Sequence, residues 1–160
     1  MPVRQLATRK HQVRDMFTRQ TNNTESYDYG ITRSEIADGR IIVVRTQGDM
    51  SRNAINTWAS LLILTMQDWK SEQPLALLHD FRHPRQGLTP YTRERTLDVL
   101  QQRPSDLTVY SAVLLPNTFM KRIIDMFLRT PAFHKKGHTV RIFHCENQAI
   151  DWLHTQLASH

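Results

Sequence analysis

The chain has 160 residues, 39% of them hydrophobic, a single cysteine and a formal net charge of +6 at pH 7. This length predicts one domain that buries about 70% of the surface of the unfolded chain, and this composition excludes a disordered protein. No apolar run reaches the roughly 18 residues of a membrane-spanning helix, and no signal-peptide pattern follows Met1, so we expect a cytoplasmic protein without membrane insertion.

The positive charge is concentrated near the N-terminus. Residues 1–24 hold five basic side chains and one acidic one, whereas the other 136 residues hold sixteen basic and fourteen acidic ones. Proteins that bind nucleic acid usually interleave basic and aromatic residues over one face of a domain. The charge here belongs mainly to a tail, so we expect no nucleic-acid partner.

A basic N-terminal arm or helix is predicted at residues 1–26, in front of a domain at residues 27–160. Apolar side chains recur every three to four positions over residues 3–17, which permits an amphipathic helix that docks on the body of the protein or on a second subunit. These apolar side chains are Val3, Leu6, Val13, Met16 and Phe17. Residues 21–26 are polar and predict a linker.

An antiparallel hairpin and a helix open the domain. Residues 27–36 alternate loosely between apolar and polar side chains, as an edge strand with one solvated face does. Asp38 and Gly39 predict a hairpin turn to a second strand over residues 40–46. A helix is predicted over residues 51–70, because its apolar positions recur at spacings of three and four.

Three strand–helix units follow the hairpin and its helix. Their predicted strands and helices alternate at residues 75–80, 90–102, 107–115, 116–129, 139–144 and 147–158. The resulting order, ββαβαβαβα, predicts an α/β protein with a mostly parallel sheet, an antiparallel edge strand and flanking helices. Right-handed crossovers place the strand-to-helix loops at one end of the sheet, where open α/β sheets usually bind ligands.

Three local features accompany this order: a polar turn and helix at residues 48–58, a strand that ends in a carboxylate at residues 77–80, and a closing strand and helix at residues 140–157 (VRIFHCENQAIDWLHTQL). With them, residues 27–158 resemble a STAS domain of the SpoIIAA-like kind. The resemblance implies a SpoIIAA-like fold and a non-enzymatic regulatory or ligand-binding module, often dimeric or part of a partner-switching system. We therefore expect a homodimer.

The best-known members of that family carry an aspartate followed by a serine that a kinase phosphorylates, at the start of the helix after the central strand. This chain has Leu88 and Thr89 at the comparable place. The resemblance is therefore to the uncharacterised bacterial branch of the family, without a conventional phosphoserine.

A strand tip, a polar loop and a helix N-terminus come together between residues 79 and 93. A guanidinium offers a bidentate fork to phosphate or carboxylate, and the N–H groups of a helix start also bind anions. The residues that we expect to bind a ligand are Asp80, Arg82, His83, Thr89, Tyr91 and Arg93. In the alternative interpretation, Asp80 caps its own loop, and the arginines are solvated or paired with Glu94 and Asp98.

Two histidine pairs raise the question of a metal site. His79 and His83 span a strand end, and lysines separate His134 from His138, so we predict no bound metal and no cofactor. Cys145 is expected to be buried and inert.

No hydrolase, metalloprotease or nucleotide-binding motif is present in the sequence, and no set of residues supplies an acid, a base and a nucleophile together. We therefore expect no enzyme. The leading hypothesis is a non-catalytic module that recognises a small anionic or amphipathic ligand at the rim formed by the C-terminal ends of the strands. The alternative is a protein–protein interaction module that docks through the N-terminal arm and a sheet edge or helix face.

Overall fold

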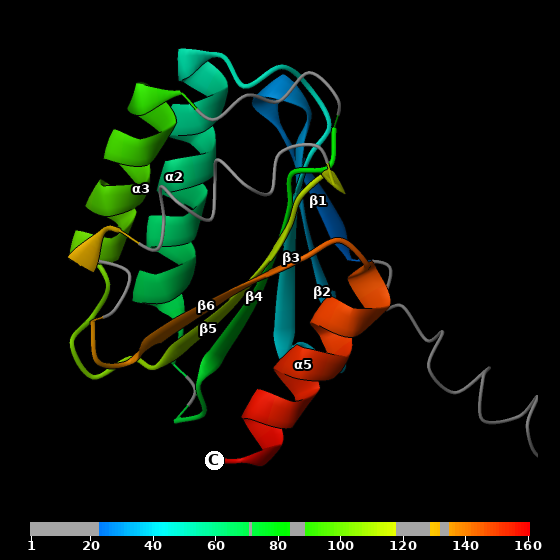
Figure 1. Cartoon of the computed structure of the whole chain (residues 1–160), viewed down its shortest axis with the longest axis vertical. Coiled ribbons are helices and arrows are strands. Elements are labelled where there is room, and N and C mark those ends of the chain that lie inside the picture. Colours follow the sequence, from blue (N-terminus) through cyan, green and yellow to red (C-terminus); the bar gives the residue numbers. More distant parts are fainter. Residues whose placement is uncertain (1–22, 71, 84–88, 118–128, 132–134) are drawn as a thin grey trace, which may run out of the picture.

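The computed structural model describes residues 23–70, 72–83, 89–117, 129–131 and 135–160. Within them, the strands form one six-stranded mixed sheet in the order β1-β2-β3-β4-β5-β6. The helices α2 (Arg52–Asp68) and α3 (Pro90–Gln101) lie side by side on one face, and α5 (Glu146–Ala158) covers the other (Figure 1). The predicted α/β architecture is therefore confirmed.

The sheet has an antiparallel part and a parallel part. β1 pairs antiparallel with β2 and β2 with β3, whereas β3 to β6 are all parallel. The strands are β1 (Thr24–Tyr27), β2 (Ile31–Ile36), β3 (Ile41–Thr46), β4 (Leu75–Asp80), β5 (Val109–Leu114) and β6 (His138–Phe143). Because parallel strands point the same way, the loops after β3, β4, β5 and β6 leave from one edge, which we call the carboxyl edge.

Two predictions at the antiparallel edge are wrong. The expected single strand over residues 27–36 is broken by a short 3₁₀ helix, η1 (Asp28–Gly30), and residues 24–26 of the expected linker belong to β1. Tyr29 and Gly30 have φ angles of 63° and 71°, which turn the chain back on itself. β1 is exposed along its whole length, so no apolar alternation marks it in the sequence.

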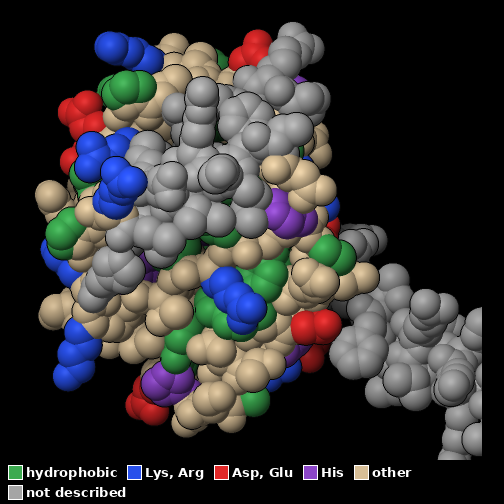
Figure 2. Space-filling view, in the orientation of Figure 1, with side chains coloured by type: hydrophobic (Ala, Val, Ile, Leu, Met, Phe, Trp, Pro, Cys, Tyr) green, Lys and Arg blue, Asp and Glu red, His purple; other side chains and the backbone are tan. Residues whose placement is uncertain are grey.

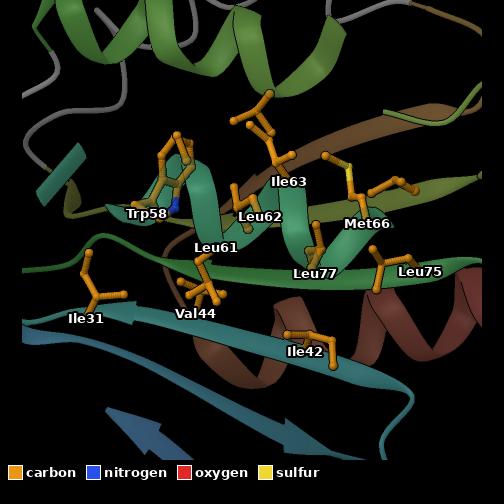
Figure 3. Close-up of a cluster of buried hydrophobic side chains, with 13 residues drawn as sticks. Ile31, Ile42, Val44, Trp58, Leu61, Leu62, Ile63, Met66, Leu75 and Leu77 are labelled. Carbon is orange, nitrogen blue, oxygen red and sulfur yellow. The ribbon is translucent and has the colours of Figure 1, made fainter. Parts of the chain in front are cut away.

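The central strands are buried on both faces. In β3, Ile42 and Val44 face α2, whereas Ile41 and Val43 face α5, as the two-residue period of a strand requires. The larger cluster joins the sheet to α2 (Figure 3); its members include Ile31, Ile42, Val44, Trp58, Leu62, Met66, Leu75 and Leu77. Two apolar layers therefore hold the sheet between its helices.

The helix α2 begins directly after Ser51, which caps its N-terminus. The Ser51 side chain accepts a hydrogen bond from the Ala54 N–H, which satisfies one of the free donors of the first turn. The predicted helices over residues 3–17 and over most of residues 116–129 lie outside the described residues. Of the helices that the structure describes, none is both long and apolar enough to cross a lipid bilayer.

The core at β4 makes a direct stability test. Leu78 is 0% exposed and packs in the cluster under α5. We expect Leu78→Ala to lower the free energy of unfolding by about 2–5 kcal/mol, because the methyl groups it removes leave a cavity. Urea denaturation measures this loss. The exposed Gln67→Ala on α2 is the control and should stay within about 0.5 kcal/mol of the unsubstituted protein; equal losses in both variants would contradict the assigned core.

Candidate functional site

A four-residue ionic cluster lies at the carboxyl edge. It is formed by Arg45 at the end of β3, Asp80 at the end of β4, Arg82 in the following loop and Glu146 at the start of α5. Arg45 Nη1 lies 2.7 Å from Asp80 Oδ2, and Arg82 Nη2 lies 2.6 Å from the same oxygen. Both arginines also pair with Glu146, with Arg82 Nη2 2.9 Å from Oε2.

Sheet register and helix position explain this cluster. The parallel pairing of β3 with β4 sets Arg45 opposite Asp80. Glu146 is the first residue of α5, where the positive end of the helix dipole favours an acidic side chain. The Arg82 backbone N–H also donates to Asp80 Oδ1, so the expected capping of the loop by Asp80 is confirmed.

The charges in the cluster balance. Burial alone would raise the pKa of Asp80, but the hydrogen bonds and charges of Arg82 and Arg45 outweigh it and hold that pKa below its ordinary value. The hydrogen bond from Arg45 likewise lowers the pKa of Glu146. Two guanidiniums therefore face two carboxylates, and the cluster keeps no surplus positive charge for an anionic ligand.

The other predicted ligand-binding residues have separate local contacts. Thr89 caps α3 by accepting from the Thr92 N–H, and Tyr91 donates from its hydroxyl to Asn56 Oδ1 on α2 at 2.6 Å. The guanidinium of Arg52 lies 4.9 Å from the centre of the Tyr91 ring.

His83 is half-buried and Arg93 is exposed. Arg95, two residues after Arg93 on α3, pairs with Asp98 at 2.6 Å, which agrees with the alternative interpretation that arginines of this region pair with neighbouring carboxylates. Arg85, another arginine of the loop, lies outside the described residues. The structure thus brings Asp80 and Arg82 together and places Thr89 and Tyr91 in a different set of contacts.

Sequence reasoning missed Arg45 and Glu146. Arg45 ends an apolar strand, and Glu146 opens a helix, so each has a local signal for a polar residue but none for the contact between them. That contact joins residues 101 positions apart, and only the order of the strands in the sheet could have indicated it.

A cavity of about 80 Å³ lies between the sheet and the pair α2 and α3. Its walls come from α2 (Trp58, Leu62, Met66), from α3 and its end (Thr92, Thr96, Val99, Leu100, Arg103), and from the strands and their ends (Leu77, His79, Phe81, Val109, Ser111, Val113, Leu115, His138, Val140, Ile142). The cavity reaches the carboxyl edge at Phe81 and Leu115. Phe81 packs against the core cluster under α2 and also forms part of the cavity wall.

An aromatic group forms one wall of this cavity. The ring of Trp58 makes edge contacts with His79 and Phe81 at centroid distances of 6.0 and 5.6 Å, and the rings of His79 and Phe81 are stacked at 6.2 Å. Such contacts contribute to stability beyond the area they bury. The wall is therefore packed and preformed.

Buried polar atoms remain unpaired around the cavity. Trp58 Nε1, His79 Nδ1 and His138 Nδ1 have no hydrogen-bond partner among the described residues. His138 uses its other ring nitrogen, Nε2, at 3.2 Å from Ser111 Oγ. An unpaired buried polar group costs about 1–3 kcal/mol, so a small ligand or water that satisfied these atoms would gain that energy.

Both cavity histidines are neutral at pH 7. Burial lowers the pKa of His79, which is 6% exposed, to about 3, with a smaller contribution from His138. Burial also lowers the pKa of His138 to about 4, helped by the positive charge of Arg103. The cavity therefore offers carbon surfaces and uncharged imidazoles, with the Arg103 guanidinium at its end donating to the backbone carbonyls of Pro104 and Lys136.

Cys145 is exposed, so the prediction of a buried thiol is wrong. It lies between β6 and α5 at the carboxyl edge, where connecting segments run over the surface. Among residues 23–70, 72–83, 89–117, 129–131 and 135–160, no three histidine, cysteine, aspartate or glutamate side chains are grouped to hold a metal ion. Figure 2 shows acidic and basic side chains together on one face, without a continuous basic surface in its described part.

No protein-family model, curated protein or solved structure matches this chain. The ionic cluster and the cavity are therefore the features of the molecule that bear on its function.

The ionic cluster gives a stability prediction. Asp80→Asn leaves two guanidiniums with one carboxylate, so we expect the free energy of unfolding at pH 7 to fall by about 2–4 kcal/mol. The control is Asp98→Asn, which breaks the more exposed pair with Arg95 and should cost less than about 1 kcal/mol. Urea denaturation of both variants makes the comparison, and similar small losses would show that the cluster contributes little.

The cavity histidines give a pH prediction. The folded protein keeps both imidazoles neutral, whereas the unfolded chain protonates them below about pH 6.5. The neutral histidines therefore contribute fully to the free energy of unfolding above about pH 6.5. Between about pH 6 and pH 4 this free energy falls by about 1.4 kcal/mol per pH unit for each histidine. His138→Gln should remove one such contribution from the slope, and Gln67→Ala, at an exposed position without a titratable group, should leave the slope unchanged. Denaturation midpoints across this pH range provide the measurement, and an unaltered slope in His138→Gln would contradict the assignment.

Proposed function

We propose that this protein is a non-catalytic ligand-binding module that takes a small amphipathic molecule, with the apolar part of the ligand in the cavity between the sheet and the α2–α3 pair. The cavity itself carries the proposal, because its walls are carbon-rich and preformed and reach the carboxyl edge at Phe81. Apolar pockets with few polar groups are the usual form of small-molecule sites.

The ionic cluster favours an amphipathic ligand over a simple anion. Arg45 and Arg82 each already pair with both Asp80 and Glu146. An anion at this place would have to displace a carboxylate from a guanidinium, which costs the ion pairs it breaks. An apolar group that enters the carbon-lined cavity breaks no ion pair.

The volume restricts the size of the buried part. An engineered cavity of about 150 Å³ holds benzene, whereas this one measures about 80 Å³. A short alkyl group therefore fits better than an aromatic ring. Trp58 Nε1 can only donate, so a ligand oxygen that reached it would provide the partner that the described residues do not.

The family assignment belongs to the same proposal. We propose a SpoIIAA-like (STAS) fold with the order ββαβαβαβα, preceded by the additional edge strand β1, in a homodimer. The hairpin β2–β3, the parallel strands β3 to β6 and the helices α2, α3 and α5 support it. The proposed protein has no catalytic group, metal or cofactor and works in the cytoplasm.

A second candidate function, protein–protein interaction, is favoured by the open edge of the sheet. Among the described strands, β6 pairs only with β5, and its residues Thr139 and Arg141 are exposed. Such an edge can accept a strand from a partner. Sedimentation analysis over a range of protein concentrations tests self-association, and a monomer at every concentration would leave the dimer without support.

The ligand proposal is tested with 1-propanol, whose alkyl group is short enough for this volume, and inorganic phosphate as probes. We follow the indole N–H signal of Trp58 by ¹H–¹⁵N NMR during each titration. Propanol should shift this signal saturably, and phosphate should not, because the cavity wall is almost entirely carbon and the ionic cluster is neutral. At a ligand concentration 100 times the dissociation constant, binding adds about 2.7 kcal/mol to stability.

Two variants on β6 provide the matched controls. Val140→Phe fills the cavity that Val140 lines, so the propanol response should disappear. Thr139→Phe adds the same ring to the neighbouring residue, whose side chain points to the other face of the strand, and the response should remain. A phosphate response that Arg82→Ala abolishes would replace the proposal with an anion site. An equal propanol response in both phenylalanine variants would place the bound alcohol outside the cavity and overturn the proposal.

A further inference from the structure

A second hollow lies on the outer side of α2. This groove, of about 640 Å³, runs between α2 and the hairpin of β1 and β2. Its walls hold the apolar side chains Leu61, Leu64, Tyr27 and Trp69. Leu64 is 56% exposed and Tyr27 36%, so these two side chains are open to solvent, whereas Trp69 is half-buried and Leu61 is buried in the core. Solvent-exposed apolar side chains gathered in one groove are typical of a binding surface.

The charge in this groove is negative. Among the described residues that line it, Arg33 is the one arginine, and it is already paired with Glu25 at 3.5 Å and with Glu35 at 2.8 Å. Asp68, at the end of α2, is exposed and makes no ion pair with any residue that the structure describes. An occupant with apolar and basic side chains would therefore match the groove.

The N-terminal part of this chain has both properties. Residues 1–22 stand directly before β1, which forms one wall of the groove, and residues 1–24 hold five basic side chains and one acidic one. The apolar side chains over residues 3–17 recur at the spacing of an amphipathic helix.

The lengths also agree. A helix over residues 3–17 would measure about 22 Å, and the α2 wall from Asn56 to Asp68 measures about 18–20 Å, at 1.5 Å per residue. Residues 18–23 extend to at most about 20 Å, enough for the chain to turn back from β1 along α2. A tether this short keeps the local concentration of the segment near the groove high.

We propose that residues 3–17 bind as an amphipathic helix in this groove of their own chain. Their apolar side packs on Leu64, Tyr27 and Trp69, and basic side chains lie next to Asp68. The basic charge of the N-terminus then has a partner within the molecule, and the exposed side of α2 is covered.

Hydrogen exchange of the full-length protein, measured by mass spectrometry, tests this docking. The peptides from residues 3–17 should exchange at least about tenfold more slowly than a free peptide of the same sequence, because bound helix protects its amides. Leu64→Lys should remove most of this protection by introducing a bulky like charge. Gln67→Lys adds the same charge on an exposed position of α2 that does not line the groove, so protection should remain.

The outcomes separate the possible occupants. Rapid exchange of residues 3–17 in the unsubstituted protein, or equal protection in the Leu64→Lys and Gln67→Lys variants, would overturn the proposal. Protection that rises with protein concentration, together with a dimer mass, would assign the segment to the groove of a second copy and would also overturn it. Asp68→Lys is the second variant: it changes an exposed side chain without altering the core, and it should weaken protection at low salt more than at high salt.

Discussion

The complete burial of β4 is the constraint on which the rest of this structure depends. All six residues from Leu75 to Asp80 are buried, between α2 on one face and α5 on the other. A strand in this position must be apolar or must have its polar groups matched by neighbours. Its first four residues satisfy this by being aliphatic or small. Its last two residues are polar and meet this requirement differently. Asp80 forms ion pairs in the ionic cluster, and His79 stays uncharged in the wall of the cavity.

Asp80 remains charged and His79 does not. Asp80 points toward the side of Arg45, Arg82 and Glu146, where ion pairs replace the water it has lost. His79 faces the aromatic wall of Trp58 and Phe81, which offers no charge to stabilise an imidazolium. One step along a strand thus changes the environment from a balanced ionic cluster to a carbon-lined cavity. This alternation follows from the two-residue period of the strand and from the different coverings of the two faces.

The sequence predicted the elements whose burial leaves a periodic pattern. The aliphatic run at Leu75 identified β4, and the spacing of the apolar residues identified α2. β1 was missed because a fully exposed strand carries no such pattern, and the turn at Tyr29 was missed because its left-handed conformation is unusual for a residue with a side chain.

Only the part of the candidate site that is formed by residues close in sequence was predicted. Asp80 and Arg82 are close in sequence, so a local motif could connect them, and the capping of the loop by Asp80 needs no distant partner. Arg45 and Glu146 enter the cluster only through the register of β3 on β4 and the position of α5. A contact between residues so far apart depends on the order of strands, which the sequence leaves open among several topologies.

The helix α2 connects the two proposed binding events. Trp58, Leu62 and Met66 line the cavity under it, whereas Leu61 and Leu64 line the groove outside it. Protein interiors are closely packed, so α2 cannot shift toward one site without changing the space at the other. If an occupied groove and an occupied cavity prefer different positions of α2, the two binding free energies are coupled, and the coupling acts equally in both directions. A tethered basic segment on one side of the helix would then set the ligand affinity on the other side.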